Sequence, residues 1–262
     1  MISVPMKSSA PLTKQTILTI NQKKVRGANN TRNILSINNE SKSNSSGMPT
    51  THANNTENNS ATLATPSMSA SMSVFKNVPQ LINSIQKGQK VPLENNGKLS
   101  SIKACLGWNV TNANCDVDVS AFLLSSTGKV IGDSWFVFYG QESSPDGSTI
   151  FSIDEGNDRE IVSVDFTKLN PSVAKIVFVL TINEALEKHL NFSMLKDAYI
   201  RIMDASDREL VSFKMDEYYA NVTSMMIGEL YQHNGIWKFN AIGNGVAKDL
   251  AGLCELYGVQ VV

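Results

Sequence analysis

Aromatic side chains are absent from the first 74 residues of this 262-residue chain, although the whole chain contains 10 Phe, 6 Tyr and 3 Trp. The segment before Phe75 is instead dominated by Asn, Ser, Thr and Ala. Such a composition buries too little apolar surface to offset the conformational entropy that folding removes. We therefore expect residues 1–74 to be a disordered tail and residues 75–262 to form the folded domain. Met72 directly precedes that domain, so a translation start there is the alternative.

Cysteines and long apolar runs are also scarce. The three cysteines are Cys105, Cys115 and Cys254; they form no Cys-x-x-Cys motif, and an odd number cannot all pair. Neither a disulfide framework nor a zinc ribbon is therefore expected. The chain contains no run of about 18 or more apolar residues, the length that is needed to cross a bilayer. Its N-terminus also lacks the apolar core of a signal peptide. We expect a cytoplasmic protein without membrane insertion. A transit peptide is the alternative for the Ser- and Thr-rich tail, which contains only two Arg.

The folded part lacks the excess of basic charge that nucleic-acid binding requires. Residues 1–74 carry seven Lys or Arg against Glu40 and Glu57, whereas the remainder carries 16 basic and 22 acidic side chains. Phosphate contacts need a surface of Lys and Arg. An acidic domain is therefore not expected to bind nucleic acid.

The residue patterns of most enzymes are missing as well. The three histidines are His52, His189 and His233. They are not spaced like metal ligands, and none of them is spaced to act as the base for a nucleophile. Gly243-Asn244-Gly245 lacks the third glycine of a dinucleotide-binding loop, and Gly128-Lys129 is not followed by Ser or Thr as in a phosphate-binding loop. We therefore expect that the protein is not an enzyme.

What the sequence does contain is a series of short strand patterns. Nine runs are expected to be strands, and they span residues 99–108, 117–124, 130–139, 161–166, 175–182, 199–203, 210–215, 225–231 and 236–242. Asn234-Gly235 joins the last two runs, and this pair favours a two-residue hairpin because both residues tolerate positive φ. The run from Ile176 to Leu180 is apolar on both faces and should be a central strand. The sequence thus predicts a mainly β fold, an antiparallel β-sandwich.

Helical patterns are few. Residues 78–85 have the apolar spacing of a short amphipathic helix, and residues 183–190 form a second short candidate. In residues 248–257 apolar side chains recur at i, i+3, i+4 and i+7. We expect this last helix to pack one face against the sandwich.

Paired acids point to a cation. Asp116 and Asp118 alternate with valines, so strand geometry places both carboxylates and the Ser120 hydroxyl on one face. Two carboxylates one pleat apart repel unless a cation lies between them. Ca²⁺ suits such a place because it binds six to eight oxygens in irregular geometry. The segment is not an EF-hand, since it lacks the glycine and the final glutamate of that loop.

Further acids stand at strand ends and in loops. They are Asp133, Asp146, Asp154, Asp158 and Glu160. Glycines nearby, Gly147 and Gly156, would allow backbone carbonyls to turn toward an ion. The alternative is that each acid only shapes a turn, because Asp and Asn are ordinary turn formers.

Ten sequence blocks occur in the order in which proteins of the TerD family present them. They are residues 106–109, 116–124, 128–130, 136–139, 144–148, 175–179, 228–231, 233–235, 237–239 and 258–259. From about residue 85 to residue 262 the chain thus resembles this tellurium-resistance and stress-response family.

The resemblance implies a β-sandwich that binds Ca²⁺ through acidic loops and takes part in cytoplasmic resistance to tellurite and other stresses. Partners would be calcium ions and other stress-response or tellurite-resistance proteins. The aspartates that match the family pattern are Asp116, Asp118, Asp133 and Asp146. With the acidic loop that follows, the candidate calcium ligands are Asp116, Asp118, Asp133, Asp146, Asp154, Asp158 and Glu160.

Two places depart from the family pattern. Asn109 stands where Asp is usual, and the shorter acidic loop ends in Asp158-Arg159-Glu160 instead of Asp-Asp-Glu. Calcium affinity that derives from ligand charge falls with each lost carboxylate. The alternative function is therefore a protein-interaction module of the same fold with weak or vestigial calcium binding.

Overall fold

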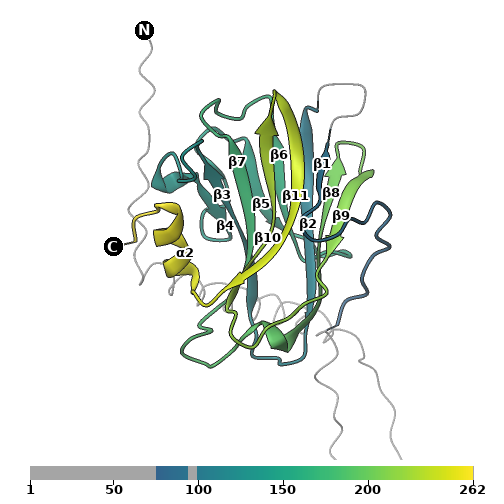
Figure 1. Ribbon diagram of the computed structural model, residues 1–262, viewed down its shortest axis with the longest axis vertical. Coiled ribbons are helices and arrows are strands. Elements are labelled where there is room, and N and C mark those ends of the chain that lie inside the picture. Colours follow the sequence, from purple (N-terminus) through teal and green to yellow (C-terminus); the bar gives the residue numbers. More distant parts are fainter. Residues whose placement is uncertain (1–74, 94–98, 262) are drawn as a thin grey trace, which may run out of the picture. The chain divides into compact units, whose positions relative to one another are not determined.

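Two antiparallel β-sheets form the folded part of the chain (Figure 1). The computed structural model describes residues 75–93 and 99–261, so the tail expected at residues 1–74 lies outside the described residues. One sheet has six strands in the order β1-β11-β10-β7-β3-β4, and the other has five in the order β5-β6-β2-β8-β9. The mainly β, antiparallel fold that the sequence predicts is confirmed.

The strands have the following bounds. They are β1 (Lys90–Pro92), β2 (Ser101–Val110), β3 (Val117–Leu124), β4 (Phe136–Phe138), β5 (Thr149–Ile153), β6 (Glu160–Asp165), β7 (Lys175–Ile182), β8 (Leu195–Asp204), β9 (Glu209–Lys214), β10 (Ser224–His233) and β11 (Ile236–Val246). Short 3₁₀ helices cover Asp133–Trp135 and Phe192–Met194, and the helix α2 covers Leu250–Tyr257.

The main core lies between the inner faces of the two sheets. Val119 and Phe178 contribute from the six-stranded sheet, Ile102 and Ile200 from the five-stranded one, and all four side chains are fully buried. Burying one such side chain stabilises a fold by about 1.5–3 kcal/mol. β7 lies between β10 and β3 and is buried on both faces, as its continuous apolar run predicts.

A second apolar cluster lies on the outer face of the six-stranded sheet, where α2 packs. Leu253 and Cys254 of α2 belong to this cluster, and the Tyr257 ring packs against the Phe122 ring of β3 at a tilt of 36°, with ring centroids 4.5 Å apart. The Asp249 carboxylate caps the helix by accepting a hydrogen bond from the Gly252 amide. The helix expected near residues 248–257 is thus confirmed. None of the described helices is long and apolar enough to cross a membrane.

We call residues 75–89 the strap. The apolar spacing of residues 78–85 predicts a short helix, but the strap contains no helix. Ile82 is 70% exposed. The amides of Ile82 and Asn83 donate to the Glu209 carboxylate, and Ser84 forms a parallel bridge with Ser212 of β9. The strap then leads into β1, which pairs with β11 of the other sheet. Backbone amides and carbonyls that form hydrogen bonds with β9 are not available for the internal hydrogen bonds of a helix.

Three further elements differ from expectation. Turns cover residues 183–189, where the sequence predicts a helix over 183–190, and Glu184 and His189 have positive φ. Only Phe136–Phe138 of the run 130–139 is a strand, because a 3₁₀ helix precedes it. The sequence did not indicate β5, which pairs with β6.

Candidate metal site

Asp118 lies on the outer face of the six-stranded sheet, in β3 and directly opposite Thr181 of β7. It is only 8% exposed. The hydroxyl oxygens of Thr181 and of Ser120, the next residue on this face of β3, are buried and have no hydrogen-bond partner among the described residues. A buried polar atom left without a partner costs about 1–3 kcal/mol. Two such hydroxyls beside a buried carboxylate therefore suit a bound cation.

Glu160 reaches this place from the other sheet. It begins β6, and its carboxylate oxygen Oε2 accepts a 2.7 Å hydrogen bond from the Val119 amide of β3. β4 pairs with β3 only from Ser120 to Phe122, so the Val119 amide lies beyond the end of β4. The fold thus places Glu160 beside the strand that carries Asp118.

Tyr139 belongs to the same group of side chains, and the sequence did not indicate it. Burial raises the pKa of the Tyr139 hydroxyl, and the negative charges of Asp118, Asp116 and Glu160 raise it further. Its closeness to Asp118 depends on the pairing of β4 with β3, which local spacing does not reveal. Asp116, just ahead of β3, is exposed at the rim of this group.

The acids of the β5–β6 loop are engaged by groups of the protein. Asp158 is buried and forms an ion pair with Arg201, with 2.5 Å between Oδ2 and Nη2. Its Oδ1 also accepts a hydrogen bond from the Tyr199 hydroxyl, at 2.9 Å. The Asp154 carboxylate accepts from the Asp158 amide and so shapes the loop. An arginine already neutralises Asp158, so this carboxylate does not fit a calcium ligand.

Asp146 serves a turn. Its carboxylate accepts hydrogen bonds from the Ser144 hydroxyl and from the amides of Ser148 and Asn170, at 2.7, 3.0 and 2.8 Å. Burial alone would raise the pKa of Asp146, but these hydrogen bonds outweigh it and hold the pKa below its usual value. The turn-forming alternative describes this residue.

Asp133 lies apart from the other acids at the start of a 3₁₀ helix, where it accepts a hydrogen bond from the Gln260 amide. Of the seven candidate ligands, Asp116, Asp118 and Glu160 are those whose negative charges raise the pKa of Tyr139. In residues 75–93 and 99–261, no three His, Cys, Asp or Glu side chains form a group that could hold a metal ion on its own. A cation beside Asp118 would therefore rely on hydroxyl and backbone oxygens as well.

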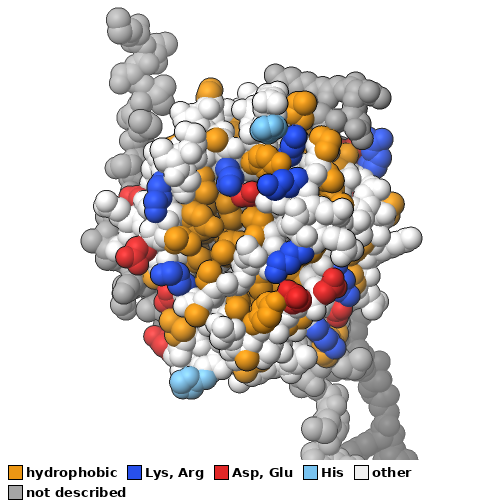
Figure 2. All heavy atoms as spheres, in the orientation of Figure 1, with side chains coloured by type: hydrophobic (Ala, Val, Ile, Leu, Met, Phe, Trp, Pro, Cys, Tyr) orange, Lys and Arg blue, Asp and Glu red, His pale blue; other side chains and the backbone are white. Residues whose placement is uncertain are grey.

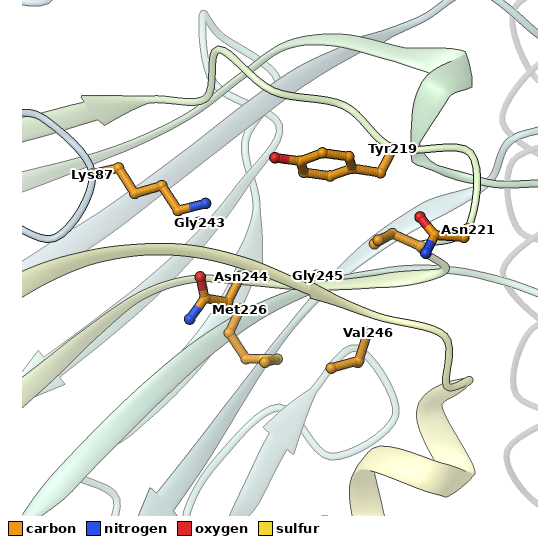
Figure 3. A pocket seen from close by; sticks show the side chains of 9 residues that line it. Lys87, Tyr219, Asn221, Met226, Gly243, Asn244, Gly245 and Val246 are labelled. Carbon is orange, nitrogen blue, oxygen red and sulfur yellow. The ribbon is translucent and has the colours of Figure 1, made fainter.

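An open groove of about 520 Å³ lies over β10 and β11, and no candidate calcium ligand lines it (Figure 3). Lys87 of the strap and Tyr219 point toward each other across it. Both contact the Glu217 carboxylate, Lys87 at 3.3 Å and Tyr219 through its hydroxyl. Met226 and Val246 supply apolar surface.

Comparison with known proteins identifies the family. The family profile described as the TerD domain matches residues 81–257. The tellurium resistance proteins TerD of Serratia marcescens and of an Alcaligenes species are 38% and 37% identical to this chain over 187 residues, which is 68% of this chain and 97% of each relative. General stress protein 16U of Bacillus subtilis is 37% identical over 190 residues, 68% of this chain and 98% of that protein. A profile match over most of the chain and relatives aligned over almost their whole length place this chain in the TerD domain family.

Proposed function

We propose that this protein is a calcium-binding, non-catalytic protein that takes part in cytoplasmic resistance to tellurite and other stresses. Its similarity to two TerD proteins and to general stress protein 16U supports the stress-related role. The absence of an enzyme motif in the sequence supports a non-catalytic role.

The observation that carries calcium binding is the buried carboxylate of Asp118 beside the hydroxyls of Ser120 and Thr181. These two hydroxyl oxygens have no hydrogen-bond partner among the described residues. These three side chains would hold the ion, with Glu160 and Asp116 adding negative charge nearby. A bound Ca²⁺ would offset the repulsion among the acids and give the buried hydroxyl oxygens a partner. It would thereby link β3 to β7.

Calorimetric titration of the metal-free protein tests this proposal. We expect Ca²⁺ to bind, and at 100 times its Kd to raise the free energy of unfolding by about 2.7 kcal/mol. Mg²⁺ should have much less effect, because it demands tight octahedral geometry and dehydrates reluctantly. An equal response to both ions would indicate general charge screening and count against a calcium site.

The variant Asp118→Asn should weaken calcium binding sharply while leaving the metal-free domain as stable as before, or slightly more so, because it relieves carboxylate repulsion. Asp207→Asn, at an exposed acid beyond β8, is the matched control and should leave binding unchanged. If Asp118 only accepts hydrogen bonds, the Asn variant should instead lose about 1 kcal/mol of stability whether or not calcium is present. That result would contradict the proposal.

A protein-interaction module is the second candidate. Figure 2 shows hydrophobic side chains gathered at the centre of the face that carries β11 and α2 in Figure 1, with Lys and Arg side chains around them. Met226 and Val246, both only partly buried, lie on this outer face. Other tellurite-resistance or stress-response proteins would be its partners. An unchanged melting temperature in chelator, together with an absence of calcium heat in calorimetry, would favour this candidate.

A further inference from the structure

The β5–β6 loop holds a cation of the chain itself. The Lys76 ammonium donates hydrogen bonds to three backbone carbonyl oxygens of this loop, those of Asp154, Gly156 and Asp158, at 3.2, 2.9 and 2.5 Å. An ammonium group has three N–H donors, so each donor has one carbonyl partner. Converging carbonyl oxygens are also the ligands that proteins offer to hard metal cations. The lysine thus occupies a place with the chemistry of a cation site.

The backbone of Lys76 is fixed just as specifically. The Asn109 side chain accepts a hydrogen bond from the Lys76 amide through Oδ1, at 2.8 Å, and donates one to the Lys76 carbonyl through Nδ2, at 3.0 Å. Asn109 is buried, and its amide group can donate through the nitrogen while it accepts through the oxygen. A carboxylate at position 109 could not make the second bond.

Arg159 supports the other side of this contact. Its guanidinium lies over the Trp108 ring, 5.7 Å from the centroid, and its Nε donates to the Trp108 carbonyl. Asn109 and Arg159, the two departures from the family pattern, thus lie together where the strap begins. Both have a structural partner there.

We propose that Lys76 is a tethered cation that fills the carbonyl site of the β5–β6 loop, and that a free hard cation such as Ca²⁺ can enter this site only by displacing Lys76. Arg201 already neutralises Asp158, the buried acid of the loop, so this carboxylate is not left for the cation in the carbonyl site. Displacement would release the Lys76 side chain, whereas Asn109 would still hold the Lys76 backbone. The strap would stay attached through its second anchor, the Ile82 and Asn83 amides on Glu209.

Removal of the tethered cation tests this proposal in the full chain. The test uses Lys76→Met in the Asp118→Asn background, so that a response cannot come from the calcium site proposed on β3. A tethered competitor acts at an effective concentration in the mM range, so its removal should tighten the apparent Ca²⁺ affinity of the loop about tenfold. The measurement is the rise in melting temperature during CaCl₂ titration, with choline chloride as the ionic-strength control.

Lys168→Met in the same background is the matched control, because Lys168 is a 60% exposed lysine that pairs with Asp165 away from the loop. It should respond to CaCl₂ no more than Asp118→Asn alone. If Lys76→Met gains no response beyond this control, the loop is not a cation site and the proposal fails. Failure of the β3 site would instead appear as an unchanged calcium response in Asp118→Asn itself.

A second measurement needs no variant. Brief acetylation of the metal-free full chain, followed by mass spectrometry, should label Lys76 more slowly than Lys168 by about tenfold, since charge-assisted hydrogen bonds hold its ammonium. Saturating CaCl₂ should raise the labelling rate of Lys76 and leave that of Lys168 unchanged. Equal rates for both lysines in the absence of metal would overturn the proposal, even if the Met variant failed to fold.

Discussion

The Asp158 carboxylate owes its role to residues far away in the sequence. Arg201 and Tyr199 both stand on β8, and they approach Asp158 only because β8 pairs with β2 and β2 pairs with β6. The side-chain exposures of the ion pair are 14% for Arg201 and 7% for Asp158. An ion pair this deeply buried is costly to break, because the remaining charge is left without a counter-charge.

We predict that Asp158→Asn lowers the free energy of unfolding by about 3 kcal/mol, since Arg201 would lose its counter-charge in a buried setting. Urea denaturation in chelator and in excess CaCl₂ provides the measurement, and the loss should be the same in both. Asp207→Asn is the control, because Asp207 pairs with Lys103 at side-chain exposures of 70% and 42% and should cost less than about 1 kcal/mol. A loss confined to the calcium-containing sample would identify Asp158 as a metal ligand after all.

At this scale the sequence predicted only part of the site. Alternation along β3 correctly placed Asp118 and Ser120 on one face and the valines in the core, because that pattern is local. It could not distinguish Asp158 from a free acid, since the partner Arg201 is 43 residues away. Nor could it indicate Lys76, whose loop partners lie about 80 residues further on.

Among the elements, the β10–β11 hairpin depends on two residues with positive φ. Asn234 has φ of 53° and Gly235 has φ of 75°, as the Asn-Gly pair predicts. Apart from Gly235 itself and its two neighbours in the chain, no atom lies within 4 Å of a Cβ added at Gly235. A substitution there therefore tests the backbone conformation alone.

We predict that Gly235→Ala destabilises the domain by about 1 kcal/mol, because an alanine in the left-handed region places its Cβ against the backbone. Gly235→Asn is the matched control and should lose clearly less, since Asn tolerates this region better. Both free energies of unfolding can be measured by urea denaturation. Equal losses for Ala and Asn would mean that something other than backbone conformation determines this position.

Elements with a strong internal pattern could be predicted, and elements held by distant contacts could not. The bounds of β7 agree with its apolar run, and the bounds of β3 agree with its alternating pattern, because both patterns are local features of the sequence. The strap has helical spacing, yet Glu209 and Ser212 of β9 determine its extended course. Tertiary hydrogen bonds here override a weak local preference.

For the whole molecule, we predict that limited trypsin digestion removes the residues before about residue 75 and leaves the folded domain intact. The first 74 residues contain seven Lys or Arg and no aromatic residue, a composition typical of segments that proteases cut readily. Cleavage after Lys76 should be slow, because its side chain is engaged by the β5–β6 loop. Mass spectrometry of the fragments over time provides the measurement.

Two outcomes would contradict this prediction. Protection of the sites before residue 75 would mean that this segment packs on the domain. Rapid cleavage after Lys76 in the intact protein would mean that the ammonium is not held by the loop. Lys76→Arg keeps a trypsin site and a positive charge, and serves as the control for protease specificity.

The strap also closes an outer strand to other molecules. β9 is the last strand of its sheet, and such a strand offers unpaired amides and carbonyls to which a second chain can add. The bridge between Ser84 and Ser212 occupies part of that row, with hydrogen bonds on both sides of Ser212. In the other sheet the outermost strands, β1 and β4, are only three residues long and give a neighbour little to pair with. The segment that carries Lys76 thus also opposes the growth of this domain into aggregates built strand upon strand.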